Sequence, residues 1–172
     1  MVQKCSYEKV LEVFLVEPTK IHFIKEISRK IKIAPTSVRN NIKQLLSENL
    51  IKKKESSPFN GFIANRDNDQ FLWKKRAYNL LSLKELSDDI VFQCHPQLLI
   101  VFGSYSLGQD IESSDIDILI STETKKEITV KKFEKKIKRD IHLIIINNLN
   151  DIEIKIKNKV LNGIVLYGGF DG

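Results

Sequence analysis

Cysteine, methionine and tryptophan are all scarce in this sequence. The 172 residues include two cysteines, Cys5 and Cys94, which lie far apart and lack the spacing of a zinc site. We expect both to be reduced thiols in the core, so a disulfide-stapled secreted scaffold is excluded.

Long apolar runs are also missing. No segment approaches the roughly 20 apolar residues of a membrane-spanning helix, and the N-terminus has no signal-peptide pattern. We therefore expect a cytoplasmic protein with no membrane partner. A hydrophobic content of 42% with 29% charged residues suits a globular protein with a sizeable core. The length fits one medium domain or two small ones.

The positive charge lies mostly in the first part of the chain. Residues 1–70 hold 13 Lys and Arg against 8 Asp and Glu, a net charge of +5. Residues 71–172 hold 15 against 14, a net charge of +1, which completes the total of +6. A polyanionic partner is therefore expected at the N-terminal part.

The N-terminal pattern predicts three helices and a hairpin. Helices are expected over 6–16, 21–31 and 35–46, and the third turns Val38, Ile42 and Leu45 inward. A strand over 50–54, a turn over 55–60 and a returning strand over 61–64 follow. This order of elements, over about residues 5–66, resembles the winged helix-turn-helix domains that bind double-stranded DNA.

That resemblance implies which residues would touch DNA. In such domains the third helix enters the major groove and the hairpin contacts the phosphate backbone. The residues on the exposed helix face and on the first strand would make these contacts: Ser37, Arg39, Asn40, Lys43, Lys52, Lys53 and Lys54. The alternative is that these residues only solvate the surface, and that the bundle docks a partner or forms a homodimer.

An acidic strand follows an apolar strand and a glycine-serine turn in the second half. The strand over 98–102 ends at Gly103 and Ser104, where the backbone amides would favour an anion. In the next strand, side-chain alternation places Asp115 and Asp117 on one face. Two carboxylates beside apolar residues are costly unless a cation compensates them, and a divalent metal would do so.

This pattern resembles the nucleotidyltransferases of the DNA polymerase beta superfamily, in particular the minimal, antitoxin-type members. The resemblance covers about residues 98–166, and it implies a third acid, Asp140, at the start of a strand over 139–146. It also implies that Asp115, Asp117 and Asp140 would be catalytic and hold magnesium, with two ions in all. Gly103 and Ser104 would bind a nucleoside triphosphate, with ATP favoured.

One position departs from the family. Members commonly carry an arginine just before the second glycine, where this chain has Leu107. Lys125 or Lys126 could replace that cation. Elsewhere the pattern predicts helices over 68–86, 87–93, 125–138 and 150–161 and a strand over 164–167. His142 would share a strand face with Asp140; we expect it to be a structural histidine, and a role as a base is the alternative.

The sequence thus predicts an α+β protein. We expect a winged helix-turn-helix over 1–67, a helical connector over 68–95, and over 96–172 a small α/β nucleotidyltransferase-like domain with a mixed sheet. The expected activity is metal-dependent transfer of a nucleoside monophosphate from ATP or another triphosphate to a hydroxyl of a protein or nucleic acid. The alternative is a DNA-binding transcriptional regulator with an inactive second domain, which senses nucleotide or docks a partner, for example as the antitoxin of a toxin.

Overall fold

The chain is divided into two compact units in the computed structural model. Residues 1–75 form the first unit and residues 76–172 the second, so the division falls inside a helix. The structure describes residues 5–57, 59–124, 127–148, 151–152 and 154–169. The division lies within the helical connector that the sequence predicted over 68–95.

Three helices form most of the first unit: α1 (Ser6–Val16), α2 (Ile24–Ile31) and α3 (Pro35–Ser47). Helix α1 has Cys5 rather than Ser6 as its N-cap residue, and the Cys5 amide donates to Glu8 Oε2 at 3.1 Å. Pro35 begins α3 because its fixed φ suits the first turn and its missing N–H is not needed there. The predicted inward residues of α3, Val38, Ile42 and Leu45, are buried.

A short antiparallel hairpin completes this unit. Strand β1 (Ile51–Lys54) pairs with β2 (Gly61–Ala64), as the sequence predicted. An isolated bridge joins His22 to Phe62, with mutual backbone hydrogen bonds of 2.8 and 2.9 Å. Gly61 is required by this close approach, because a Cβ there would lie 2.3 Å from the Ile21 side chain.

Two helices follow the hairpin, α4 (Asp69–Ser82) and α5 (Lys84–Cys94). The break between them falls at Leu83, earlier than the predicted end of the first helix at residue 86. His95 ends α5 in a left-handed conformation, with φ of 44°. Cys94 is buried as expected, but Cys5 is exposed, which corrects the prediction of two core thiols.

The second unit contains a mixed four-stranded sheet, which confirms that expectation. Its strands are β3 (Leu98–Phe102), β4 (Ile116–Ser121), β5 (Ile141–Ile146) and β6 (Ile164–Gly168), in the spatial order β5-β4-β3-β6. Strands β4 and β5 are parallel, whereas β3 is antiparallel to both β4 and β6. Asp115 and Asp140 therefore stand one residue before parallel neighbours.

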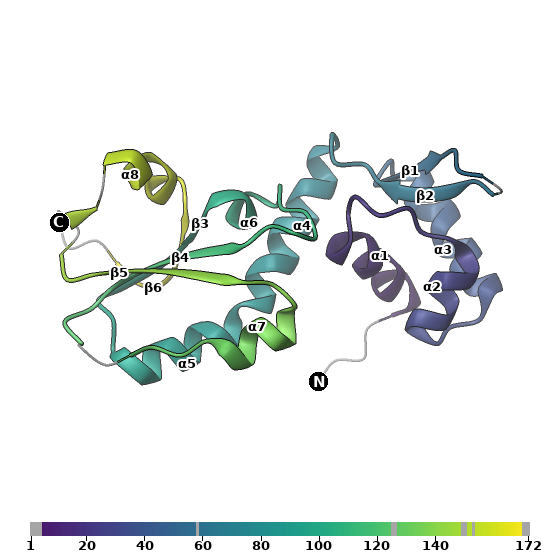
Figure 1. Cartoon of the computed structure of the whole chain (residues 1–172). Coiled ribbons are helices and arrows are strands. Elements are labelled where there is room, and N and C mark those ends of the chain that lie inside the picture. Colours follow the sequence, from purple (N-terminus) through teal and green to yellow (C-terminus); the bar gives the residue numbers. More distant parts are fainter. Residues whose placement is uncertain (1–4, 58, 125–126, 149–150, 153, 170–172) are drawn as a thin grey trace. The chain divides into compact units, whose positions relative to one another are not determined.

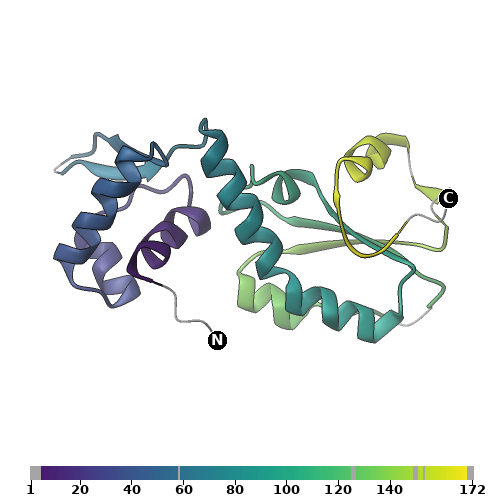
Figure 2. The same cartoon turned by 180° about the vertical axis from the view of Figure 1, so that it is seen from behind.

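Helices cover the two faces of this sheet (Figures 1 and 2). Helix α5 and helix α7 (Lys131–Ile137) pack on one face, where Leu86, Ile90 and Phe133 meet the odd residues of β3 and the even residues of β4. Helix α8 (Ile154–Leu161) contributes Val160 to the core of the other face, with Ile100 and Leu119. The predicted start of α8 at Asn150 lies outside the described residues.

A short helix, α6 (Gly103–Leu107), follows β3 directly, where the sequence predicted a turn or a helical turn. Among the described residues, no helix combines the length and the apolar character that a membrane crossing requires.

Candidate functional site

The turn from β3 into α6 packs against an acidic side chain of β4. Gly103 has φ of +73°, and a Cβ at this position would lie 2.6 Å from Oδ2 of Asp117. Asp117 faces this turn because it pairs in register with Phe102, the residue before Gly103. Glycine therefore serves two needs here, a left-handed backbone and close approach to a carboxylate.

Asp117 also contacts a histidine from the neighbouring strand. His142 pairs with Asp117 across the parallel strands, and its Nδ1 lies 3.2 Å from Oδ1 of Asp117. The ring donates this hydrogen bond when Nδ1 carries a proton. Both side chains reach solvent, with exposed fractions of 34% for Asp117 and 65% for His142. The sequence favoured a structural role for His142 and left a role as a base open as the alternative.

Asp115 and Asp140 lie together at the starts of these two strands. Both are exposed, and the Ile116 amide donates to the Asp140 carbonyl at 2.9 Å. Both also line one cavity of about 360 Å³, together with Ser113, Ser114 and residues of α7 and its end. Because the strands are parallel, the two acids occupy equivalent places before the first paired residues, Ile116 and Ile141.

The three predicted acids have different surroundings in the structure. Asp117 lies with Gly103 and His142, and Asp115 lines a cavity with Asp140. In the part of the chain that the structure describes, no group of three His, Cys, Asp or Glu side chains is placed to hold a metal ion. Magnesium is commonly held by one or two carboxylates, with water and substrate phosphates as further ligands. Asp115 and Asp140 offer the carboxylate oxygens that magnesium prefers, in a cavity that the cationic side chains of Lys135 and Lys138 also line.

A second cavity, of about 200 Å³, adjoins the turn at Gly103. Gly103, Ser106 and Leu107 of α6 form one side, and Asn158, Lys159 and Asn162 from α8 and its end form the other. Leu107 is 40% exposed. Lys159 is an exposed cation beside Leu107, whereas Lys125 and Lys126 lie outside the described residues.

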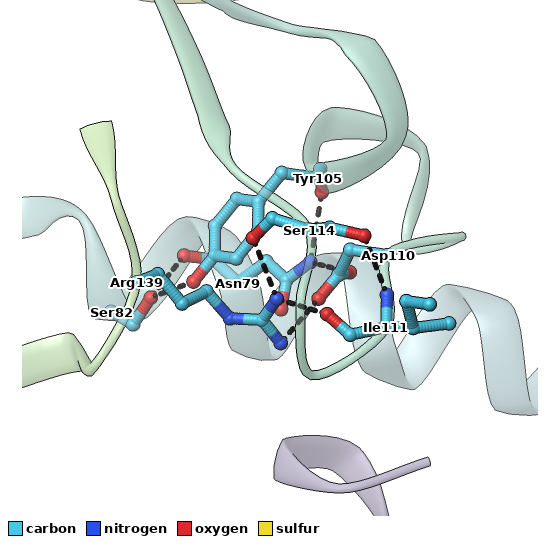
Figure 3. Close-up of polar contacts among 7 residues, drawn as sticks. All are labelled: Asn79, Ser82, Tyr105, Asp110, Ile111, Ser114 and Arg139. Carbon is cyan, nitrogen blue, oxygen red and sulfur yellow. Dashed lines mark hydrogen bonds and ion pairs between the residues drawn. The ribbon is translucent and has the colours of Figure 1, made fainter. Parts of the chain in front are cut away.

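Sequence reasoning missed a buried polar cluster next to the acids (Figure 3). Arg139 forms an ion pair with Asp110, with 2.9 Å between Nη2 and Oδ2, and their side chains are 7% and 0% exposed. Asn79 donates to Oδ1 of Asp110 at 2.7 Å. Burial, as the largest effect, raises the pKa of Tyr105, which lies in the same cluster. Only the proximity of Arg139 to Asp140 in the sequence could have indicated this cluster.

The predicted DNA-contacting residues are accessible on the first unit. Arg39, Asn40 and Lys43 are exposed on α3, and Ser37 is half-buried. The side chains of β1 from Lys52 to Lys54 are also exposed. Lys52 is already paired with Asp67, with 2.7 Å between its Nζ and Oδ2.

Comparison with known proteins gives a family for the second unit. The family model described as polymerase beta, nucleotidyltransferase matches residues 84–169, half of the 172 residues. A crystal structure of a provisionally assigned nucleotidyltransferase from Sulfolobus solfataricus is 20% identical, with 56% of this chain and 86% of that chain covered and a TM-score of 0.34. No curated protein matches the chain. By the extent of the family match, the chain belongs to the polymerase beta nucleotidyltransferase family.

Proposed function

We propose that this protein is a metal-dependent nucleotidyltransferase. It would move a nucleoside monophosphate from a nucleoside triphosphate, in the first place ATP, to a hydroxyl group of a protein or nucleic-acid acceptor. The observation that carries the proposal is the packing of Gly103 against Asp117, because it joins the turn after β3 to a carboxylate of β4. The family match to residues 84–169 supports the same reaction class.

The triphosphate would bind at the turn and in the adjoining cavity. Gly103 and Ser104 begin α6, where backbone amides are available to an anion. Lys159 lines the cavity beside Gly103 and would supply a cation that Leu107 does not. A small, mostly apolar cavity next to the proposed phosphate-binding turn would suit part of a nucleotide.

The carboxylates would hold magnesium. Asp115 and Asp140 would be the first pair of ligands, since they line one cavity, and Asp117 would add a carboxylate two residues along β4. Bound magnesium, with two ions expected, would offset phosphate charge and make the acceptor hydroxyl more acidic. Asp140 would also orient that hydroxyl, and His142 would hold the Asp117 carboxylate in place.

The chemistry is an in-line displacement at phosphorus. The acceptor oxygen forms a bond to the α-phosphorus, the bond from that phosphorus to the bridging oxygen breaks, and pyrophosphate leaves. The hydroxyl proton is released to a carboxylate or to solvent. The chain contributes positioning and charge and forms no covalent bond to the nucleotide.

We further propose that the first unit binds double-stranded DNA as a winged helix-turn-helix. Three helices followed by an antiparallel hairpin support this reading, as do the exposed basic residues of α3 and β1. Helix α3 would enter the major groove, and the lysines of β1 would neutralise phosphates.

The test is incubation with ATP labelled at the α-phosphate, magnesium and a cell extract, followed by separation of labelled products. We expect label on a macromolecule, and loss of that label in a double variant, Asp115→Asn with Asp117→Asn. Asp88→Asn is the matched control, because Asp88 is an exposed carboxylate of α5 paired with Lys84. Undiminished transfer by the double variant would contradict the catalytic proposal.

A second candidate function is a DNA-binding regulator whose nucleotidyltransferase-like domain is inactive. The observation in its favour is Leu107, an exposed apolar residue beside Gly103 where a phosphate-binding cation would be useful. Such a protein would sense nucleotide or mask a partner toxin encoded by a neighbouring reading frame. Calorimetry showing ATP and magnesium binding without any transfer would favour this function.

A further inference from the structure

Arg139 joins three segments that carry the candidate site. It precedes Asp140 at the start of β5, and its Nη2 is paired with Asp110 in the loop after α6. Its Nη1 donates to the carbonyl of Ser114 at 3.0 Å and also to the carbonyl of Ile111. Arg139 directly precedes Asp140, and Ser114 directly precedes Asp115. The contact from the Arg139 guanidinium to Ser114 therefore links the segments that carry the two acids (Figure 3).

The guanidinium also contacts the helix of the phosphate-binding turn. Its central carbon lies 5.7 Å from the centre of the Tyr105 ring, and Tyr105 belongs to α6. The Tyr105 hydroxyl is within 2.8 Å of the Ser82 hydroxyl, and its carbonyl accepts from Asn79 at 2.8 Å. Helix α4 thus holds the far side of the same cluster.

We propose that Arg139 is a positioning residue that fixes Asp115 and Asp140 relative to each other and to the turn at Gly103. This inference rests on the proposed function for its catalytic consequence. The loop over 109–115 has two short internal links, from Ile111 to the Ser114 hydroxyl and from the Ser114 amide to the Ile111 carbonyl. Arg139 donates to the carbonyl oxygens of Ile111 and Ser114 in this loop. It therefore sets the position of Asp115, the residue after Ser114.

Only an arginine can make all of these contacts. Its planar group presents several N–H donors in a fixed fork, so one arm reaches Asp110 while the other reaches two carbonyls. A lysine would keep the positive charge opposite buried Asp110 but would offer a single donor atom. Arg139→Lys therefore keeps the charge that compensates buried Asp110 but loses the hydrogen bonds that align the loop. A purely structural role would need only the charge.

The first experiment measures the position of the acids without any metal. Spin labels are attached to Asp115→Cys and Asp140→Cys in a chain that also carries Cys5→Ser and Cys94→Ala. With Arg139 present we expect strong dipolar broadening at low temperature, because the two sites precede paired residues of adjacent strands. With Arg139→Lys we expect weaker broadening and a wider range of distances.

Ser82→Ala is the matched control, because it removes the hydrogen bond to the Tyr105 hydroxyl and leaves every contact of Arg139 to the loop. We expect its spectrum to match that of the labelled chain with Arg139. All samples are compared after circular dichroism shows that they are folded. Equal broadening with Arg139 and with Arg139→Lys would overturn the proposal.

The second experiment titrates Mn²⁺ into the unlabelled protein and measures free Mn²⁺ by its paramagnetic resonance. We expect the dissociation constant to rise about tenfold in Arg139→Lys, the lower end of the range for changes outside the metal ligands themselves, because the loop would no longer hold Asp115 in place. It should stay unchanged in Ser82→Ala. Absence of Mn²⁺ binding by the unchanged protein would contradict the proposed metal site, while the label spectra would still decide the positioning role. If the unchanged protein binds Mn²⁺, an equal affinity in a folded Arg139→Lys protein would overturn the positioning role of Arg139.

Discussion

Asp117 occupies the space that any side chain at position 103 would need. A Cβ built on Gly103 would lie 2.6 Å from the Asp117 Oδ2, and the backbone there has φ of +73°. The conformation of the turn at Gly103 and the position of the Asp117 carboxylate therefore depend on each other. A substitution at either residue should shift the other.

Gly103→Ala should lower the free energy of unfolding by about 2 kcal/mol, because an L-residue is strained at this φ and its methyl group meets a carboxylate. Urea-induced unfolding measures this loss. Gly169→Ala is the control, since nothing lies within 4 Å of a Cβ at Gly169, and it should change the free energy by less than about 0.5 kcal/mol. Equal stability of the two variants would contradict the close contact.

His142→Asp should strengthen binding of a divalent cation. It would place a second carboxylate opposite Asp117, where the His142 Nδ1 now lies 3.2 Å from the Asp117 Oδ1. Two adjacent carboxylates repel each other unless a cation lies between them. We expect the Mn²⁺ dissociation constant, measured by titration, to fall by about tenfold, a gain of roughly 1.4 kcal/mol.

The control for this prediction is His142→Asn, which removes the imidazole but adds no charge. It should leave Mn²⁺ affinity near that of the unchanged protein. If the aspartate and asparagine variants bound Mn²⁺ equally, Asp117 would not be part of a cation site.

Lys54→Glu should weaken DNA binding more than Lys52→Glu does. The two lysines lie two residues apart on β1 and share a face, but the Lys52 ammonium is already paired with Asp67. A lysine that neutralises a phosphate contributes about one unit to the slope of log affinity against log salt concentration. Mobility shifts of double-stranded DNA at several salt concentrations measure this slope. A larger effect of Lys52→Glu would contradict the assignment.

The first unit should lose stability as the pH falls through the range of histidine titration. Burial lowers the pKa of His22 below its ordinary value of 6.5, although the Glu17 carbonyl and carboxylate act in the opposite direction. His22 therefore stays neutral when folded and gains a proton when unfolded. The unfolded chain binds more protons, so the free energy of unfolding decreases from pH 7 downward through 6.5 toward the folded pKa.

His22→Gln should reduce this dependence on pH, because glutamine keeps a donor for the Glu17 carbonyl and does not titrate. His95→Asn is the control, since His95 is exposed and asparagine tolerates its left-handed backbone. Urea unfolding at several pH values between 5.5 and 7.5 compares the three proteins. A steep decline that persisted in His22→Gln would assign the effect to other groups.

Local patterns in the sequence predicted most elements of both units. Apolar runs and glycine placed β3 and the turn at Gly103, and the alternation of isoleucines placed β4. Alternation applies only inside a strand, however, and β4 begins at Ile116. The strand pattern therefore covers Asp117 itself, and the shared face of Asp115 and Asp117 stays a prediction.

Long-range pairing was the part that the sequence could not supply. The opposition of His142 and Asp117 depends on the register of two strands separated by a helix, and no local pattern encodes it. The same holds for Arg139, whose partners Asp110 and Ser114 lie more than 20 residues away. The burial of Arg139 and Asp110, which sets this ion pair apart from the surface pairs, cannot be seen in the sequence.

The parallel register of β4 and β5 also sets which changes of length the protein would tolerate. Deletion of one residue within β5 would turn the side chains that follow the deletion to the opposite face of the sheet. An added residue in the long connection between Thr122 and Val130 would leave both strands in register. Related chains should therefore vary in length within this connection and remain constant in length within the two strands.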